Sequence, residues 1–285
     1  MGKIVRALSE TGGVLCAAID ATDIVADIAR VHEASPAVTA ALGRMAAAAS
    51  LMGSMLKYDG DKLTVRISGG GPCGVLTAVS DYRGNVKCCA GNTKADAEDV
   101  ESLVGCEGQL TVIKDMGLKE PYIGQIPLSS GNIARVLTEY YSISEQLPTV
   151  FTLGILFDDN SKVTAAGGYM VQVVPPISDK SVQTLDENLA NMEEIGKMLE
   201  QRFTPEKIAL KALSRLGGEV LDEWEAGYKC DCSREKTEQI LASLGKKELA
   251  RLAEEQENTE VCCHFCNKKY VFSSDDMLKL LKMQN

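Results

Sequence analysis

The sequence predicts an α+β fold with an N-terminal antiparallel-sheet domain around a central helix, a helical linker and a small C-terminal zinc-binding module. Short strand patterns separated by turns surround one long Ala- and Met-rich helix in the first part of the chain. Pro175-Pro176 then ends the strand pattern, and sparse helical stripes follow. Four cysteines stand in two close pairs near the end. We therefore expect a domain at 1–176, a linker at 177–228 and a module at 229–285.

The first domain alternates between strand and helix patterns. Ser35-Pro36 opens the long helix, with proline at the first helical position, and its apolar body runs over residues 40–56. Small residues around most of its circumference predict a buried central helix. Shorter helices are expected at 24–32 and 132–141. Strands are expected at 3–8, 14–20, 63–68, 75–80, 86–90, 110–114, 122–126, 150–157 and 168–174.

The predicted linker carries a thin apolar stripe. Its apolar residues recur at helical spacing with acidic residues between them: Val182, Leu185, Leu189, Met192 and Ile195. Thr204-Pro205-Glu206 begins another helix, and Gly217-Gly218 ends it. Such helices depend on a docking surface more than on intrinsic propensity. We therefore expect the linker to be ordered only while something holds it.

The C-terminal module is expected to contain short helices and one hairpin. Ser233 caps the first helix, a second covers about 247–255, and a hairpin over 260–272 folds around the second cysteine pair. Ser274, followed by Asp275 and Asp276, is expected to cap a final helix. So small a unit has a small core, and a structural metal would supply much of its stability.

Bulk properties exclude several classes of function. The net charge of −10 opposes binding to phosphate backbones, so we expect no nucleic-acid partner. No apolar run is long enough to cross a membrane, so we expect no membrane partner. Ten cysteines without an export signal indicate a reducing compartment and a cytoplasmic location. Five of them are scattered through the first half and are expected to act as small hydrophobic residues: Cys16, Cys73, Cys88, Cys89 and Cys106.

The two cysteine pairs are the strongest functional signal. Cys230-Asp-Cys232 and Cys263-His-Phe-Cys266 are separated by residues 233–262. Two such pairs brought together by a loop form a four-sulfur cage suited to Zn²⁺, without a free position for catalytic water. The pattern is compatible with a static zinc site and with a redox sensor, because zinc keeps the sulfurs as reactive thiolates. Cys262 remains a spare ligand, an alternative disulfide partner or an inert thiol.

An enzyme is poorly supported. His264 lies inside a C-x-x-C motif, but a strand pattern follows where a thioredoxin-like protein has a helix. We expect His264 in a solvent-facing loop and His32 at the surface or capping a helix. Neither histidine lies beside a nucleophile, so acid–base catalysis has no candidate residues.

The chain also resembles the heat-shock protein 33 family, also called the 33 kDa chaperonin family, over its full length. The most specific matches are Lys229-Cys-Asp-Cys-Ser-Arg-Glu and Cys263-His-Phe-Cys266. Supporting matches are Leu56-Lys-Tyr-Asp-Gly-Asp, Ser144-Glu-Gln-Leu-Pro-Thr and Ala165-Ala-Gly-Gly-Tyr-Met-Val-Gln-Val. The order of domain, linker and cysteine module is the same.

The resemblance implies a redox-regulated molecular chaperone, an ATP-independent holdase that protects unfolding proteins from aggregation during oxidative and heat stress. The reduced form would carry one Zn²⁺ per chain on Cys230, Cys232, Cys263 and Cys266 and would be inactive. Oxidation would form the disulfides Cys230–Cys232 and Cys263–Cys266, release the zinc and unfold the module and linker. Clients would be unfolded proteins, and active forms in this family are commonly homodimers.

Cys262 departs from the family pattern, so the exact second disulfide stays open. Two other functions are weighed against the chaperone: a thiol–disulfide oxidoreductase using Cys263 and Cys266, and a constitutive zinc-stabilised binding module. For the chaperone, candidate client-binding residues are the linker stripe Val182, Leu185, Leu189 and Met192.

Overall fold

The computed structural model describes residues 1–283 and divides the chain into two compact units. The first unit spans Met1–Lys229, and the second begins at Cys230. Each has its own apolar core. The segment expected as a linker, 177–228, lies within the first unit.

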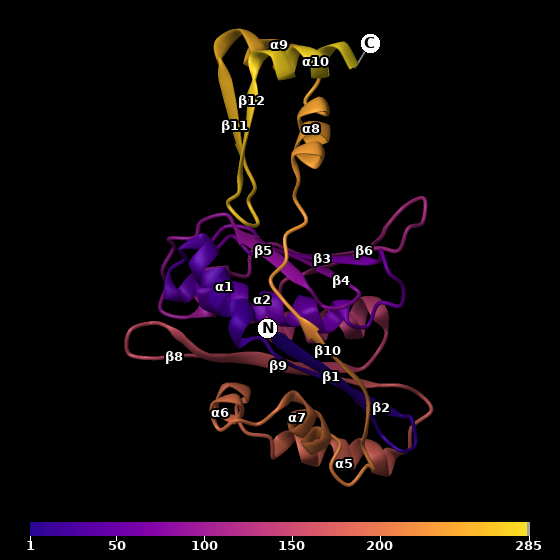
Figure 1. Cartoon of the computed structure of the whole chain (residues 1–285). Helices are drawn as coiled ribbons and strands as arrows, with labels where there is room; N and C mark the ends of the chain where they lie inside the picture. Colours follow the sequence, from indigo (N-terminus) through magenta and orange to yellow (C-terminus); the bar gives the residue numbers. More distant parts are fainter. Residues whose placement is uncertain (284–285) are drawn as a thin grey trace. The chain divides into compact units, whose positions relative to one another are not determined.

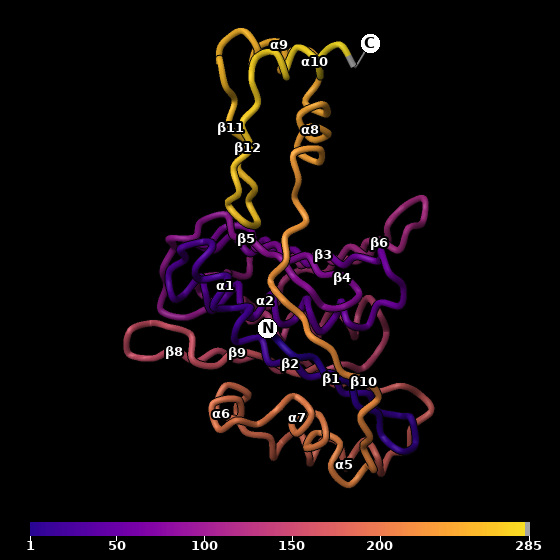
Figure 2. Tube along the Cα trace, viewed as in Figure 1, coloured from indigo at the N-terminus to yellow at the C-terminus, as the bar shows by residue number. Residues whose placement is uncertain are grey.

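Two five-stranded sheets, antiparallel throughout, build the first unit (Figures 1 and 2). The strand order of one sheet is β10-β1-β2-β9-β8, and that of the other is β5-β4-β3-β6-β7. The first sheet comprises β1 (Gly2–Leu8), β2 (Val14–Asp20), β8 (Thr149–Phe157), β9 (Val163–Val173) and β10 (Glu219–Ala226). The second comprises β3 (Lys62–Ser68), β4 (Leu76–Asp81), β5 (Val86–Ala90), β6 (Gln109–Asp115) and β7 (Tyr122–Pro127).

The central helix α2 (Pro36–Gly53) packs between the two sheets and confirms the prediction from its composition (Figure 1). The hydroxyl of Ser35 accepts a hydrogen bond from the amide of Val38, which satisfies one free donor of the first turn. Its alanines let both sheets approach closely, and nearly the whole helix is buried. The same unit contains α1 (Thr22–His32), α3 (Val100–Val104), α4 (Ile133–Tyr140) and a π-helical turn (Tyr141–Glu145). The sequence predictions contained neither α3 nor the π turn.

Three helices cover the other face of the first sheet: α5 (Asp179–Ala190), α6 (Ile195–Glu200) and α7 (Pro205–Ala212). Ser178 and Thr204 cap α5 and α7. The stripe predicted from periodicity points largely toward the sheet, because Leu185 is 3% exposed and Leu189 and Met192 pack on the same core. Val182 is half-buried. Figure 1 shows these helices along the sheet face formed by β1, β2 and β9.

Strand β10 corrects the expectation of a helical linker up to residue 228. Residues 219–226 pair antiparallel with β1, and Arg6 forms a salt bridge with Asp222 across the pair. The chain then passes to the edge of the second sheet, where the amide of Val86 donates to the carbonyl of Gly227 and the amide of Lys229 donates to the carbonyl of Val86. The Tyr228 hydroxyl lies 2.9 Å from Nε2 of His32 and donates to the carbonyl of Cys88. We call this segment, Gly227–Lys229 with its partners, the Tyr228 clamp.

The second unit has a small core beneath one hairpin. It contains α8 (Arg234–Ala242), α9 (Lys246–Glu255), β11 (Asn258–Cys262), β12 (Lys269–Ser273) and α10 (Ser274–Met283). The fully buried side chains of this core are Leu249, Phe272 and Met277. The cap of α10 is Ser273 rather than Ser274: its hydroxyl accepts from the amide of Asp276, whose carboxylate accepts from the amide of Ser273.

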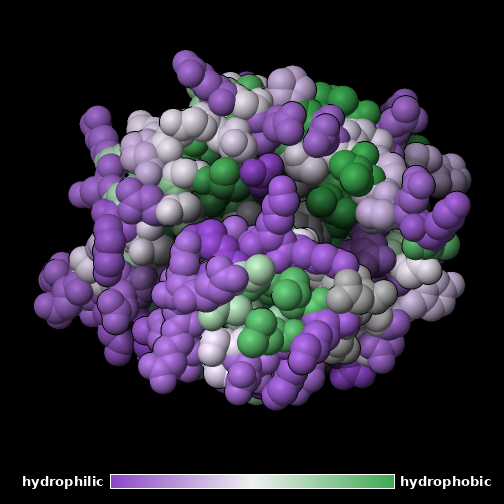
Figure 3. All heavy atoms as spheres, turned by 90° about the horizontal axis from the view of Figure 1, so that it is seen from above, coloured by the Kyte–Doolittle hydropathy of each residue, from purple (hydrophilic) through white to green (hydrophobic). Residues whose placement is uncertain are grey.

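Within residues 1–283, no helix is both long and apolar enough to cross a membrane. In the view from above, hydrophobic side chains gather in small patches that are separated by hydrophilic ones (Figure 3).

Asn188 is predicted to hold α5 against α7. Its buried amide donates hydrogen bonds to the carbonyls of Ala212, at 3.0 Å, and Ser214. Asn188→Ala would leave both carbonyls without this donor and should destabilise the docked helices by roughly 2 kcal/mol. Hydrogen exchange across 179–213 should therefore accelerate. Gln183→Ala, on the exposed side of the same helix, is the control; equal protection in the two variants would contradict this role.

Candidate metal centre

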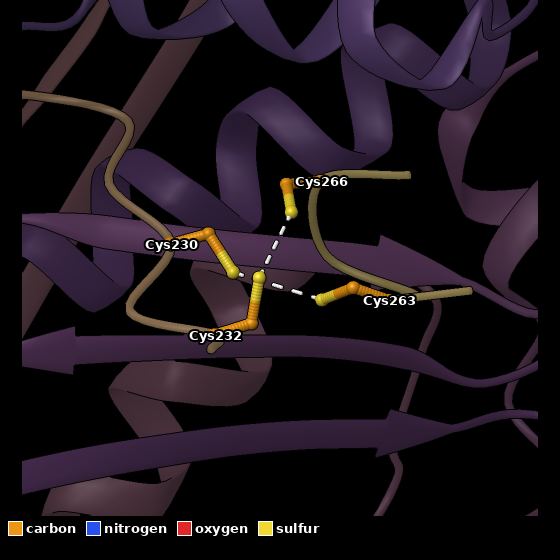
Figure 4. A group of neighbouring side chains, drawn as sticks. All are labelled: Cys230, Cys232, Cys263 and Cys266. Atoms are coloured by element: carbon orange, nitrogen blue, oxygen red, sulfur yellow. Dashed lines mark hydrogen bonds between the residues drawn. The ribbon is translucent and has the colours of Figure 1, made fainter. Parts of the chain in front are cut away.

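The structure brings together the side chains of the two cysteine pairs (Figure 4). Cys230 and Cys232 lie in the segment that leads into α8, and Cys263 and Cys266 lie in the turn between β11 and β12. All four belong to the second unit. The cluster therefore links the start of this unit to the tip of its hairpin.

Backbone hydrogen bonds shape the turn that carries the second pair. The carbonyl of Cys263 accepts from the amides of Cys266, at 3.3 Å, and Asn267, at 2.8 Å. The amide of Cys263 donates to the carbonyl of Lys268 at 2.9 Å. Asn267 takes the left-handed conformation with φ of 58°, which asparagine tolerates better than most residues. The turn thus directs both sulfurs to one side.

The segment of the first pair is also fixed locally. The hydroxyl of Ser233 caps α8 by accepting from the amide of Lys236 at 3.2 Å, as predicted. The Lys236 ammonium donates back to the carbonyl of Asp231 at 2.8 Å and also binds its carboxylate. Cys230 and Cys232 therefore flank Asp231, whose carbonyl and carboxylate are both bound by Lys236.

Sulfur–sulfur distances match a closed four-ligand site. Sγ of Cys230 lies 3.7 Å from Sγ of Cys263, and Sγ of Cys232 lies 3.4 Å from Sγ of Cys266. All four sulfurs lie within 4.8 Å of one another. A tetrahedral zinc–thiolate site has sulfurs about 3.8 Å apart, given zinc–sulfur bonds of about 2.3 Å. A disulfide needs about 2.05 Å, so these four are free thiols in a metal-binding arrangement.

The surroundings shift the pKa values of Cys230, Cys232 and Cys266 in different directions. Burial raises the pKa of Cys230 and of Cys266. Burial also opposes ionisation of Cys232, but hydrogen bonds from Tyr270 and the neighbouring thiols outweigh it and lower its pKa to about 7. Four adjacent thiolates would repel one another, so full ionisation needs a cation among them.

Two residues that the sequence did not single out support the cluster. The Tyr270 hydroxyl donates to Sγ of Cys232 at 3.1 Å. Arg234 donates to the carbonyl of Val271 at 2.7 Å, binds the carboxylate of Asp276 at 2.9 Å and lies over the ring of Phe272 at 4.3 Å. It thus ties α8 to β12 and α10. Arg234 belongs to the motif Lys229-Cys-Asp-Cys-Ser-Arg-Glu, but the sequence gives no partner for it or for Tyr270; both sets of partners come from the fold.

Cys262 lies outside the cluster. It ends β11 opposite Lys269 and is exposed to solvent, whereas the next residue, Cys263, turns into the cluster. In this arrangement Cys262 is not one of the four gathered sulfurs. His264 is exposed in the turn, as predicted.

His32 corrects an expectation. It was predicted at the surface or as a cap, but it is 5% exposed and belongs to the Tyr228 clamp. Its partner lies 196 positions away in sequence. Burial lowers the pKa of His32, which favours the neutral ring.

The scattered cysteines are mostly core residues. Cys16, Cys73 and Cys88 are buried, Cys89 is half-buried and Cys106 is exposed. Burial raises the pKa of Cys16 to about 12 and also raises that of Cys73 and Cys88. Because thiolates are the reactive form, these three are poorly reactive and behave as small hydrophobic residues.

Comparisons with known proteins point to one family over nearly the whole chain. The family model described as "Hsp33 protein" matches residues 2–273. The chain is 43% identical to a 33 kDa chaperonin of Clostridioides difficile (strain 630), covering 98% of each sequence. It is 37% identical to one of Alkaliphilus metalliredigens (strain QYMF), again over 98% of each.

A solved structure gives the same result for the fold. The crystal structure of the 33 kDa chaperonin from Thermotoga maritima superposes with a TM-score of 0.89 at 32% identity, covering 99% of this chain and 98% of that one. The strand and helix order described above is therefore that of a known fold. The chain belongs to the Hsp33 family.

Proposed function

We propose that this protein is a redox-regulated, ATP-independent chaperone that binds unfolding proteins after oxidation and is inactive while reduced and zinc-bound. The observation that carries the proposal is the gathering of four thiols within 4.8 Å on a unit with a small core. The name of its relatives, 33 kDa chaperonin, supports the chaperone part. Ten free cysteines suit a reducing cytoplasm.

Zinc is the metal that fits the donors best. Four cysteine sulfurs, without a carboxylate or imidazole among them, form a soft and closed donor set. When bound, Zn²⁺ would hold all four sulfurs as thiolates and join the segment before α8 to the β11–β12 turn. Since the four sulfurs fill the coordination shell, the site would be structural and would have no role in hydrolysis.

Oxidation by peroxide provides the switch. A thiolate attacks the peroxide, forming a sulfenic acid and releasing hydroxide; a second thiol then displaces the hydroxyl as water and forms the disulfide. Each disulfide thus consumes one peroxide and two thiols and yields two waters. Two disulfides per chain use all four ligands, so the metal is released.

We propose the pairs Cys230–Cys232 and Cys263–Cys266. In the folded unit, sulfur contacts of 3.7 and 3.4 Å join one pair to the other. Cross-links between the pairs would keep the hairpin tip attached to the start of α8. Disulfides within each pair leave these segments free to separate, which the proposed opening requires.

The energetics support unfolding of the second unit. Zinc contributes roughly 10–16 kcal/mol to small zinc-finger peptides, mostly as folding free energy. Whole domains are stable by only about 5–15 kcal/mol. A unit with so few buried apolar residues therefore has little left once its metal is removed.

The linker, 177–228, would supply the client surface. Its helices α5–α7 cover an apolar sheet face that includes Cys16, Ala18 and Tyr169. Undocking would expose this face together with the stripe Val182, Leu185, Leu189 and Met192. Exposed apolar surface of this kind binds unfolded clients and favours the homodimer that we propose for the active form.

Peroxide treatment at elevated temperature should release one zinc per chain and oxidise four thiols to two disulfides. Suppression of client aggregation should appear at the same time, because both follow from opening of the second unit. Zinc release, free-thiol content and light scattering of a heat-denatured client measure the three effects. Equal chaperone activity of the reduced, zinc-loaded protein would contradict the switch, and catalytic reduction of insulin would favour an oxidoreductase.

Tyr270→Phe should lower zinc affinity about tenfold, because hydrogen bonds to metal ligands typically contribute 10–100-fold. Competition with a chromophoric chelator measures the affinity. Tyr58→Phe, at an exposed position of the first unit, is the control. An unchanged affinity would show that the bound sulfur does not use this hydrogen bond.

Cys262→Ser should keep both zinc binding and activation, because this side chain lies outside the cluster. Cys232→Ser, in contrast, should lose most zinc affinity and the folded state of the second unit. Disulfide mapping after oxidation distinguishes the variants. If Cys262→Ser blocked activation, Cys262 would belong to a functional disulfide.

A further inference from the structure

Arg44 is the single charged residue of the central helix α2. Its Nε is buried and has no hydrogen-bond partner within residues 1–283. Burial lowers the pKa of the Arg44 guanidinium, and the negative charge of Glu101 opposes this shift. The Glu101 carboxylate, however, accepts a hydrogen bond from the side chain of Asn132 at 2.9 Å. Arg44 is thus a half-buried cation with one buried donor that has no protein partner among the described residues.

Arg44 lines a cavity of about 380 Å³ between α2, α4 and β8. Its other lining residues are Asn132, Ala134, Arg135 and Thr138 of the α4 region and Phe151, Thr152 and Leu153 of β8. No acidic side chain is among these described lining residues. A volume of this size suits a small molecule.

Two further features make the cavity electropositive. Arg135 lies on its wall with a guanidinium that is mostly exposed and pairs with Glu139 at 3.1 Å. The first turn of α4 also faces the cavity, since Asn132, Ala134 and Arg135 belong to it or precede it. A helix N-terminus attracts negative charge.

We propose that this cavity binds a small oxyanion, a carboxylate or phosphate group, through the Arg44 guanidinium. A guanidinium matches the two oxygens of such a group, and an unpaired buried donor is unfavourable. The apolar side chains of Ala134, Phe151 and Leu153 would contact the organic part of a carboxylate or phosphate ester. The site lies in the first unit, apart from the thiol cluster, and is independent of the redox switch.

The test compares Tm of the full-length, reduced, zinc-loaded protein in phosphate, in succinate and in chloride at matched ionic strength. At tenfold excess over its Kd, the bound anion should raise Tm of the first unit by roughly 3–5 °C above chloride. Arg44→Met should remove this difference. It should also raise Tm in chloride, because the buried, unpartnered Nε is replaced by an apolar chain of similar length.

Arg66→Gln, at an exposed position of β3, is the matched control and should respond to the anions as the wild type does. If Arg44→Met does not fold, Arg135→Gln should weaken the response, and titration calorimetry with each anion measures it directly. A response to phosphate but not succinate, or the reverse, identifies the ligand class. The proposal is overturned if neither anion raises Tm above its value in chloride. It is also overturned if Arg44→Met shows the same rise as the wild type. If Arg44→Met does not fold, the same criterion applies to Arg135→Gln.

Discussion

Four crowded sulfur atoms are the constraint on which the second unit depends. Sγ atoms from the start of this unit and from its hairpin turn approach to 3.4 and 3.7 Å, a spacing that thiolates alone would resist and a central cation would favour. The local structure agrees with this arrangement: the Cys263 turn, the Ser233 cap and the Tyr270 hydroxyl all direct sulfur toward one point. Because the apolar core of this unit is small, we expect that the loss of a metal bound here would not be compensated elsewhere in the unit.

The first unit has a different organisation. Its central helix is lined by small residues, so two sheets pack on it closely, and the sheet of β1, β2 and β9 is apolar on both faces. One face contributes to the main core, and α5–α7 cover the other. If α5–α7 undocked, the second apolar face of this sheet would become exposed and could bind other apolar surfaces. This property makes the proposed holdase activity compatible with a well-packed domain that need not unfold itself.

Periodicity was enough to locate most strands and the central helix, because each has a buried face set by its own residues. Strand β10 was missed since Glu219-Val-Leu-Asp-Glu-Trp-Glu-Ala is acidic and mostly exposed; its pairing with Lys3 and Arg6 becomes visible only beside β1. The cysteine cluster was predictable because its ligand spacing is local. Tyr270, Arg234 and the burial of His32 were not, because each depends on a partner brought close by folding. Arg44 is visible in the sequence as the one charged residue of an apolar helix. That it lines a cavity can be seen only in the folded structure.

The Tyr228 clamp separates the cysteine cluster from β10 along the chain. It begins three residues before Cys230, and its contacts with Val86, His32 and Cys88 all lie in the first unit. In the proposed mechanism, unfolding that spreads from the oxidised second unit would meet this clamp before it reached β10 and the helices α5–α7. Oxidation alone would then loosen only the second unit, and heat would be needed to open the Tyr228 clamp. The protein would thereby work as a coincidence detector, responding to oxidant and heat together and ignoring either signal on its own.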